Sequence, residues 1–294
     1  MARTLFIIED ATLKSLGDAI VAKMVDEVKG IFSFAPKFTV VTAAPDAIPE
    51  KVDFTDSIVK AVATDGDVTA AQNQAEQQEL RSIEFAIKQN KLNIKMPSFK
   101  RSSAKPERGG VAWRTKEVFT SGGHKVALVL TGGVASIETA ATDALLFLAP
   151  NHWTLEEAED RRNAKLSKAR LDHGKDREDR IAEANASFEK SKKHWALQGT
   201  APKSWPQNLQ ATVGIALGRL VAHEARHQYI VEHFDDGGLG GDGAELLGVA
   251  STEKFHKDDQ KNLIGQLAKL EAAQKTATVH LETFPEGQAF AFKE

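Results

Sequence analysis

Two histidines and a glutamate form the sequence His-Glu-x-x-His at His223, Glu224 and His227. On an α-helix, residues i and i+4 are about 40° apart around the axis, so both histidines project from one face. Two imidazoles held in this way can bind a zinc ion. Glu224 starts from the next position, where its carboxylate can reach a water molecule beside the metal without being a ligand. The spacing therefore predicts a hydrolytic zinc site, in which Glu224 takes a proton from water and passes it to a leaving amine.

A helix within the core must hold these residues. The segment Ala211–Ala222 before the motif is apolar at helical spacing, which favours a buried helix over about 207–229. The chain has no cysteine, so a metal would be held by His, Asp and Glu. The alternative is an ordinary helix with one histidine in the core and one at the surface.

The extended stretch resembles the signature of the metzincin zinc proteases, because a further histidine, His233, follows at the family's third-ligand position. The resemblance implies a zinc metallopeptidase that binds Zn²⁺ through His223, His227 and His233, with Glu224 as the general base. It also implies an α/β (α+β) fold with a mixed twisted sheet, an active-site helix and a C-terminal helix. A protein or peptide substrate would lie antiparallel to an edge strand within 111–130.

The sequence departs from this family at two points. The family usually has glycine where this chain has Ile230, because the backbone leaves the helix there. On an unbroken helix His233 would point about 80° from His223 and about 120° from His227. The chain therefore either leaves the helix at a neighbouring residue or takes its third ligand from a later one. The later candidates, ranked after His233, are Asp235 and Asp236, then Glu245, with Asp242 also in reach.

The second departure is the methionine turn for which the family is named. Every methionine of this chain lies before residue 97. Leu246 or Leu247 could take the place of that methionine, since Leu and Met have similar volumes.

Hydrophobic periodicity predicts the elements around the motif. Strands are expected at 4–8, 38–42, 92–96, 111–120 and 125–130, and one or two short strands within 276–292; residues 54–64 fit a short helix or a strand. Helices are expected at 11–31, 70–89, 135–148, 207–229 and 251–273. The opening strand, helix and strand predict a right-handed crossover between parallel neighbours. Ser121-Gly122-Gly123 predicts a hairpin turn.

The chain divides into three parts of one catalytic domain. Residues 1–150 would supply the sheet and its first helices, and 200–294 the zinc helix, a glycine-rich loop and the closing helix. Residues 151–199 form a charged insertion, in which 154–197 predict two helices broken at Gly174. Such a run is usually a solvated hairpin, and an arm that binds a partner is the functional alternative.

Composition bounds the function further. The chain has 294 residues and a formal net charge of −3, which argues against a general nucleic-acid binder. The sequence has no apolar run of membrane-spanning length, and its N-terminal apolar run is too short for a signal peptide, so we expect a cytoplasmic protein or leaderless export. Three rival functions remain: an inactive or structural-zinc interaction module displaying 154–197, a zinc hydrolase of a non-peptide amide, and a leaderless secreted effector protease.

Overall fold

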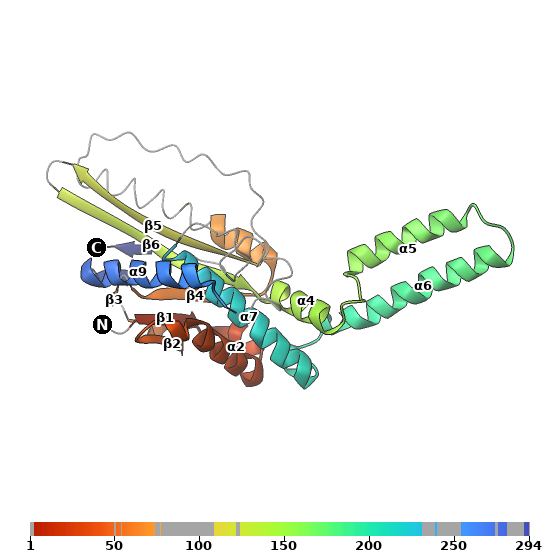
Figure 1. Ribbon diagram of the computed structural model, residues 1–294, viewed down its shortest axis with the longest axis horizontal. Coiled ribbons are helices and arrows are strands. Elements are labelled where there is room, and N and C mark those ends of the chain that lie inside the picture. Colours follow the sequence, from red (N-terminus) through yellow and green to blue (C-terminus); the bar gives the residue numbers. More distant parts are fainter. Residues whose placement is uncertain are drawn as a thin grey trace.

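The computed structural model describes residues 3–49, 51–53, 55–73, 77, 109–121, 124–230, 239, 254–273, 276–280 and 291–293. The described part has a mixed α/β architecture, in which helices pack against a twisted sheet and one helical hairpin projects away from it (Figure 1). The strands follow the order β2-β1-β4-β6-β8-β7-β3, and β5 pairs with β6.

The sheet begins as a parallel crossover, as expected. Strand β1 (Arg3–Ile8) is parallel to β2 (Phe38–Ala43) on one side and to β4 (Ser57–Val62) on the other. Between β1 and β2 the expected single helix over 11–31 is wrong, because the chain forms α1 (Ala11–Ser15) and α2 (Asp18–Ile31). Gly17 separates them with a φ of 86°, a conformation that only glycine adopts without strain.

The long strand β6 (His124–Ser136) organises the second half of the sheet. It pairs antiparallel with β5 (Gly110–Ser121) from Ser121 opposite His124 to Gly110 opposite Ala135. On its other side, its end pairs parallel with β4, and Leu128 and Val129 near its middle pair antiparallel with β8 (Ala291–Lys293). Strands β7 (Thr276–His280) and β3 (Lys51–Asp53) continue the sheet. The expected hairpin is therefore present, and within the described residues β5 has β6 as its strand partner.

Helices α2 and α7 cross at unusually close range. Helix α7 (Gln207–His227) carries Gly214 and Gly218, and a Cβ atom added to either would lie 2.8 Å from a backbone carbonyl oxygen of α2, that of Ile20 or of Met24. The two glycines therefore let the backbones approach, while Arg219 on α7 pairs with Glu27 on α2 at 2.9 Å. This contact fixes the helix that carries the His-Glu-x-x-His motif.

The remaining helices complete the cover of the sheet. Helix α4 (Ile137–Leu148) begins two residues later than expected, because Ala135 and Ser136 still belong to β6 and the Ser136 hydroxyl caps the helix. Helix α9 (Lys257–Ala273) begins six residues later than expected. Residues 65–73 are helical, and short 3₁₀ turns lie at Phe32–Phe34, Pro45–Ala47, Ala196–Gly199 and Pro202–Ser204. The expected strand at 92–96 and most of the expected helix at 70–89 lie outside the described residues.

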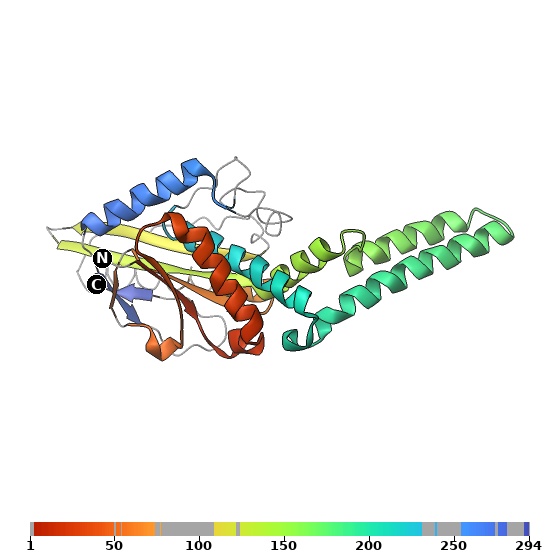
Figure 2. The same cartoon turned by 60° about the horizontal axis from the view of Figure 1, so that its bottom comes forward.

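The charged insertion forms the expected pair of helices. Helix α5 (Leu155–Ala169) and helix α6 (Lys175–Trp195) are antiparallel, and Gly174 precedes α6 with a φ of 62°. We call this hairpin, residues 155–195, the arm. Both views show it extending well beyond the sheet (Figures 1 and 2). Within the described part of the chain, every helix is too short or too polar to cross a membrane.

Candidate metal centre

The last turn of α7 brings His223 and His227 together. Their Nε2 atoms are 2.9 Å apart, and their rings meet edge to face with centroids 4.5 Å apart. His223 is 3 % exposed, whereas His227 is half-buried and so forms the outer side of the pair. The i, i+4 spacing therefore directs two ring nitrogens at one point, and His227 is the histidine nearer to solvent.

Backbone carbonyl groups set the tautomer of both rings. The Nδ1 atom of His223 lies 2.6 Å from the carbonyl oxygen of Leu239, and that of His227 lies 3.1 Å from the carbonyl oxygen of Ile230. A carbonyl oxygen can only accept, so each Nδ1 must donate a proton. In the neutral rings both Nε2 lone pairs then face one another, which is repulsive unless a proton or a metal ion lies between them. Histidine ligands in metal sites are typically held by this kind of Nδ1 hydrogen bond.

The helix ends just after the motif, where the side chains of Gln228 and Tyr229 bond to backbone groups near β4. Helix α7 stops at His227, and the Gln228 side chain accepts from the Ile58 N–H at 3.1 Å and donates to the Ile58 carbonyl at 3.0 Å. The Tyr229 hydroxyl donates to the Thr55 carbonyl at 2.7 Å. The chain therefore leaves the helix before Ile230, and Ile230 does so without a left-handed backbone conformation.

The third ligand is not placed by the described residues. His233, Asp235, Asp236, Asp242 and Glu245 all lie outside them, as do Leu246 and Leu247. Within the described residues no group of three or more His, Asp or Glu side chains could hold a metal ion. His223 and His227 are thus a candidate pair of ligands, and the zinc site and His233 as its third ligand stay predictions.

Glu224 lies against β5, which is an outermost strand of the sheet among the described residues. Its side chain is 4 % exposed, and a Cβ atom added to Gly110 would lie 2.3 Å from its Oε1 atom. A Cβ atom added to Gly133 on β6 would lie 3.2 Å from the Glu224 Cβ atom. Two glycines on paired strands therefore make the space that the Glu224 side chain occupies.

A buried ion pair links the end of α7 to α9. The Arg226 Nε atom lies 2.8 and 3.0 Å from the two carboxylate oxygens of Asp259, and the side chains are 0 % and 2 % exposed. The Arg226 Nη1 atom also lies 3.4 Å from the Ile230 carbonyl oxygen, which accepts from His227. Arg226 thus holds the same carbonyl that orients a candidate ligand.

The carboxyl groups of Asp65 and Asp143 lie close enough together to affect one another's charge. Asp65 accepts from the hydroxyls of Ser136 and Thr139 at 2.7 Å each, and Thr139 also packs near Gly109. Burial, and then the nearby charge of Asp65, raises the pKa of Asp143 to about 7. Among the described residues, the Asp143 Oδ2 atom has no hydrogen-bond partner. Asp143 therefore takes up a proton near neutral pH.

Several of these supporting residues have only weak signals in the sequence. Arg226 lies in a buried helix, which indicates a buried partner but does not identify it as Asp259. Gln228 and Tyr229 bond to residues about 170 positions earlier in the chain, and no local pattern marks such pairs. The roles of Gly110 and Gly133 follow from close approach, which sequence spacing does not reveal. No family model, no curated protein and no solved structure matches this chain.

Proposed function

We propose that the protein is a zinc-dependent metallopeptidase. The observation that carries the proposal is the facing pair of Nε2 atoms, 2.9 Å apart, with both Nδ1 atoms committed to carbonyl oxygens. Two zinc-bound nitrogens in a tetrahedral site would be roughly 3.3 Å apart. The two Nε2 atoms would therefore have to move apart by only about 0.4 Å to bind the ion. An ordinary pair of helix histidines would not need both rings held in the same tautomer.

His223 and His227 would hold the zinc ion, with His233 as the proposed third ligand. The end of α7 supports this assignment, because the chain leaves the helix within three residues of His227 and so is not confined to the helical direction that would carry His233 away. Bound zinc would supply a Lewis acid that lowers the pKa of a water molecule and polarises a substrate carbonyl.

Glu224 is the proposed general base and then general acid. It follows His223 directly, so its carboxylate starts one position round the helix from the ligand face. Burial against Gly110 holds the carboxylate in one place, and a fixed proton acceptor is what proton transfer requires. The residue would take a proton from water and deliver it to the amine of the broken peptide bond.

Strand β5, an outermost strand among the described residues, is the proposed binding site for the substrate backbone. It pairs with β6 on one side, and the Glu224 carboxylate lies at its first residue, Gly110. An extended peptide added to the other side of β5 would form main-chain hydrogen bonds and bring its carbonyl groups past the motif. The metzincin resemblance, carried by His223, Glu224, His227 and His233, implies the same arrangement.

The first test is metal content, measured by mass spectrometry on protein purified without added metal. Wild type should carry about one zinc ion per chain, and His227→Ala and His233→Ala should lose it. His173→Ala, which removes an exposed histidine from the arm, is the matched control and should keep it. Zinc retained by His233→Ala alone would move the third ligand to Asp235, Asp236, Asp242 or Glu245.

The second test separates catalysis from binding. Glu224→Gln should keep zinc and lose cleavage of a quenched-fluorescence peptide library by at least about 10³-fold, because proton transfer is removed while the ligands stay. An unchanged cleavage rate would remove Glu224 from the mechanism. Wild type without bound metal would refute the proposal and favour an interaction module.

A further inference from the structure

Contacts at the base of the arm join the end of α6 to the residues just before α5 and to Trp205. The indole Nε1 of Trp195 donates to the Trp153 carbonyl, and the rings of His152 and His194 stack with centroids 4.5 Å apart. Burial, and then the neighbouring His152, lowers the pKa of His194, which favours the neutral ring. Trp205 donates to the Leu197 carbonyl at 2.7 Å. These contacts close the base of the hairpin and hold its two helices side by side.

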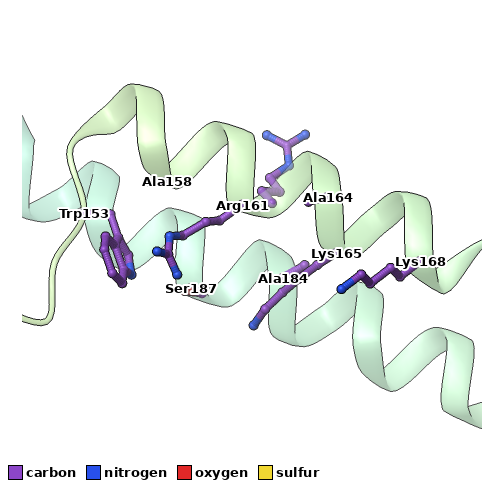
Figure 3. A pocket seen from close by; sticks show the side chains of 9 residues that line it. Trp153, Ala158, Arg161, Ala164, Lys165, Lys168, Ala184 and Ser187 are labelled. Carbon is purple, nitrogen blue, oxygen red and sulfur yellow. The ribbon is translucent and has the colours of Figure 1, made fainter.

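Small residues leave a groove between α5 and α6. Ala158 and Ala184 are the buried residues near its floor, and neither side chain is large enough to fill the seam. A cavity of about 240 Å³ remains there. Figure 3 shows Trp153, Arg161, Lys165 and Lys168 following one another along this seam. The residues that line the groove are Trp153, Ala158, Arg161, Arg162, Ala164, Lys165, Lys168, Ala184 and Ser187.

The charged side chains that line the groove are all cationic. Arg161, Lys165 and Lys168 follow i, i+4, i+7 spacing, so they form a row about 10 Å long on one side of α5. Arg161 lies over the Trp153 ring at 3.3 Å, and Arg162 lies over the Phe188 ring at 4.8 Å. Lys165 is bridged to Glu183 at 2.7 Å, whereas among the described residues Arg161 and Lys168 form no ion pair. The groove therefore presents positive charge that the arm itself balances only at Lys165.

We propose that this groove binds an acidic helical segment of a partner protein. A helix with acidic residues at i, i+4 and i+7 would match the row of cations, and a helix lying in a groove is a common mode of peptide recognition. Trp153 and Leu155, which are 38 % and 44 % exposed, offer an apolar contact at one end. Partner charge opposite to a surface charge gives specificity and faster association.

The carboxylates of the arm favour a helix over nucleic acid as the occupant. The first two turns of α5 expose Glu156, Glu157, Glu159 and Asp160 just before the cationic row. These side chains would repel a phosphate backbone that continued past the groove, whereas a short acidic helix can end at its edge. The groove is thus a local cationic site on an arm of nearly balanced charge.

The experiment uses the whole protein and a labelled helix-forming peptide with glutamates at i, i+4 and i+7 and one terminal leucine. We expect binding with a Kd on the order of 10–100 µM that weakens with salt. Reversal of the row by Arg161→Glu, Lys165→Glu and Lys168→Glu should weaken binding at least about tenfold. The matched control, Arg177→Glu, Lys190→Glu and Lys193→Glu, changes the same charge on exposed sites outside the groove and should alter the Kd by less than about twofold.

Two single substitutions test the proposal independently if the triple variant folds poorly. Glu183→Gln releases Lys165 from its bridge and should strengthen peptide binding about two- to threefold, and Lys168→Gln should weaken it by a similar factor. Any of four results would overturn the proposal: equal binding of a glutamine version of the peptide, equal binding by the groove triple variant, tighter binding of a duplex DNA, or a dimer that the groove triple abolishes. None of these measurements involves zinc or cleavage, so their failure leaves the proposed function untouched.

Discussion

The arm and the rest of the described chain, which we call the body, contain ion pairs of nearly equal length that contribute differently to stability. Arg226 and Asp259 lie 2.8 Å apart with side chains 0 % and 2 % exposed, whereas Lys165 and Glu183 lie 2.7 Å apart with side chains 48 % and 70 % exposed. In the body, loss of one partner leaves a charge without water. In the arm, water replaces the partner at once. Distance alone therefore says little about what an ion pair contributes, and burial decides it.

The largest expected effect is on the buried pair. Asp259→Ala should lower the free energy of unfolding by about 4 kcal/mol, because it leaves the Arg226 guanidinium buried without its carboxylate. Denaturant unfolding measures this value. Asp258→Ala is the matched control, since the neighbouring side chain is 82 % exposed, and it should change stability by less than about 0.5 kcal/mol. Equal effects of the two variants would contradict the comparison.

The next effect concerns a buried carboxyl group without a cation. The pKa of Asp143 is raised to about 7, so the folded protein holds a proton there that the unfolded chain releases above about pH 4. Its contribution to stability is therefore complete below pH 4 and is lost as the pH rises through 7. Asp143→Asn should be more stable than wild type at pH 8 by on the order of 3 kcal/mol, and nearly equal to it at pH 4.

The pH range over which stability falls identifies the carboxyl group that causes the fall. Burial, opposed by hydrogen bonds from Thr4 and Asp53, raises the pKa of Asp56 to about 6, so loss of stability between pH 4 and 6 belongs to both carboxyls. The fall between pH 6 and 8 should disappear in Asp143→Asn alone. The exposed Asp160→Asn on the arm should show the wild-type pH profile. An unchanged profile in Asp143→Asn would contradict the assignment.

A smaller effect is expected where the body holds Glu224. Gly110→Ala places a Cβ atom where the Glu224 carboxylate lies and should displace it by about 1 Å, lowering the proposed peptidase activity roughly a hundredfold. Zinc content should not change. Gly265→Ala on α9 meets nothing within 4 Å and should leave the cleavage rate unchanged. Full activity in Gly110→Ala would mean that Glu224 can move without consequence.

The smallest effect is expected on the arm. Glu183→Ala removes the partner of Lys165, yet both side chains are well solvated, so the Tm should stay within about 1 °C of wild type. Thermal unfolding followed by circular dichroism measures it. A clear fall in Tm would show that the arm depends on this bridge, and the contrast between the two regions would weaken.

Local patterns predicted much of the fold and the close approach of His223 and His227. The i, i+4 spacing of His223 and His227 places both rings on one face, and the apolar lead-in predicts the helix that carries them. Local patterns also predicted the crossover from β1 to β2 and the two helices of the arm. These features depend on residues that are close together in the chain.

Long-range contacts account for what the sequence could not predict. Helix α7 ends at His227 because Gln228 and Tyr229 bond to Ile58 and Thr55, and nothing near Gln228 marks those partners. The break at Gly17 was missed because the hydrophobic period runs through it unchanged. Residues Gly110 and Gly133 look like ordinary strand glycines until Glu224 is placed against them.

The ion pair between Arg226 and Asp259 also bears on how the chain is made. The two residues are 33 positions apart, so at 5–20 residues per second Asp259 emerges from the ribosome about 2 to 7 s after Arg226. During that interval α2 and α7 can already pack through Gly214 and Gly218, while the guanidinium still needs water. The nascent protein should therefore keep the Arg226 side chain hydrated until α9 has emerged and Asp259 can pair with it.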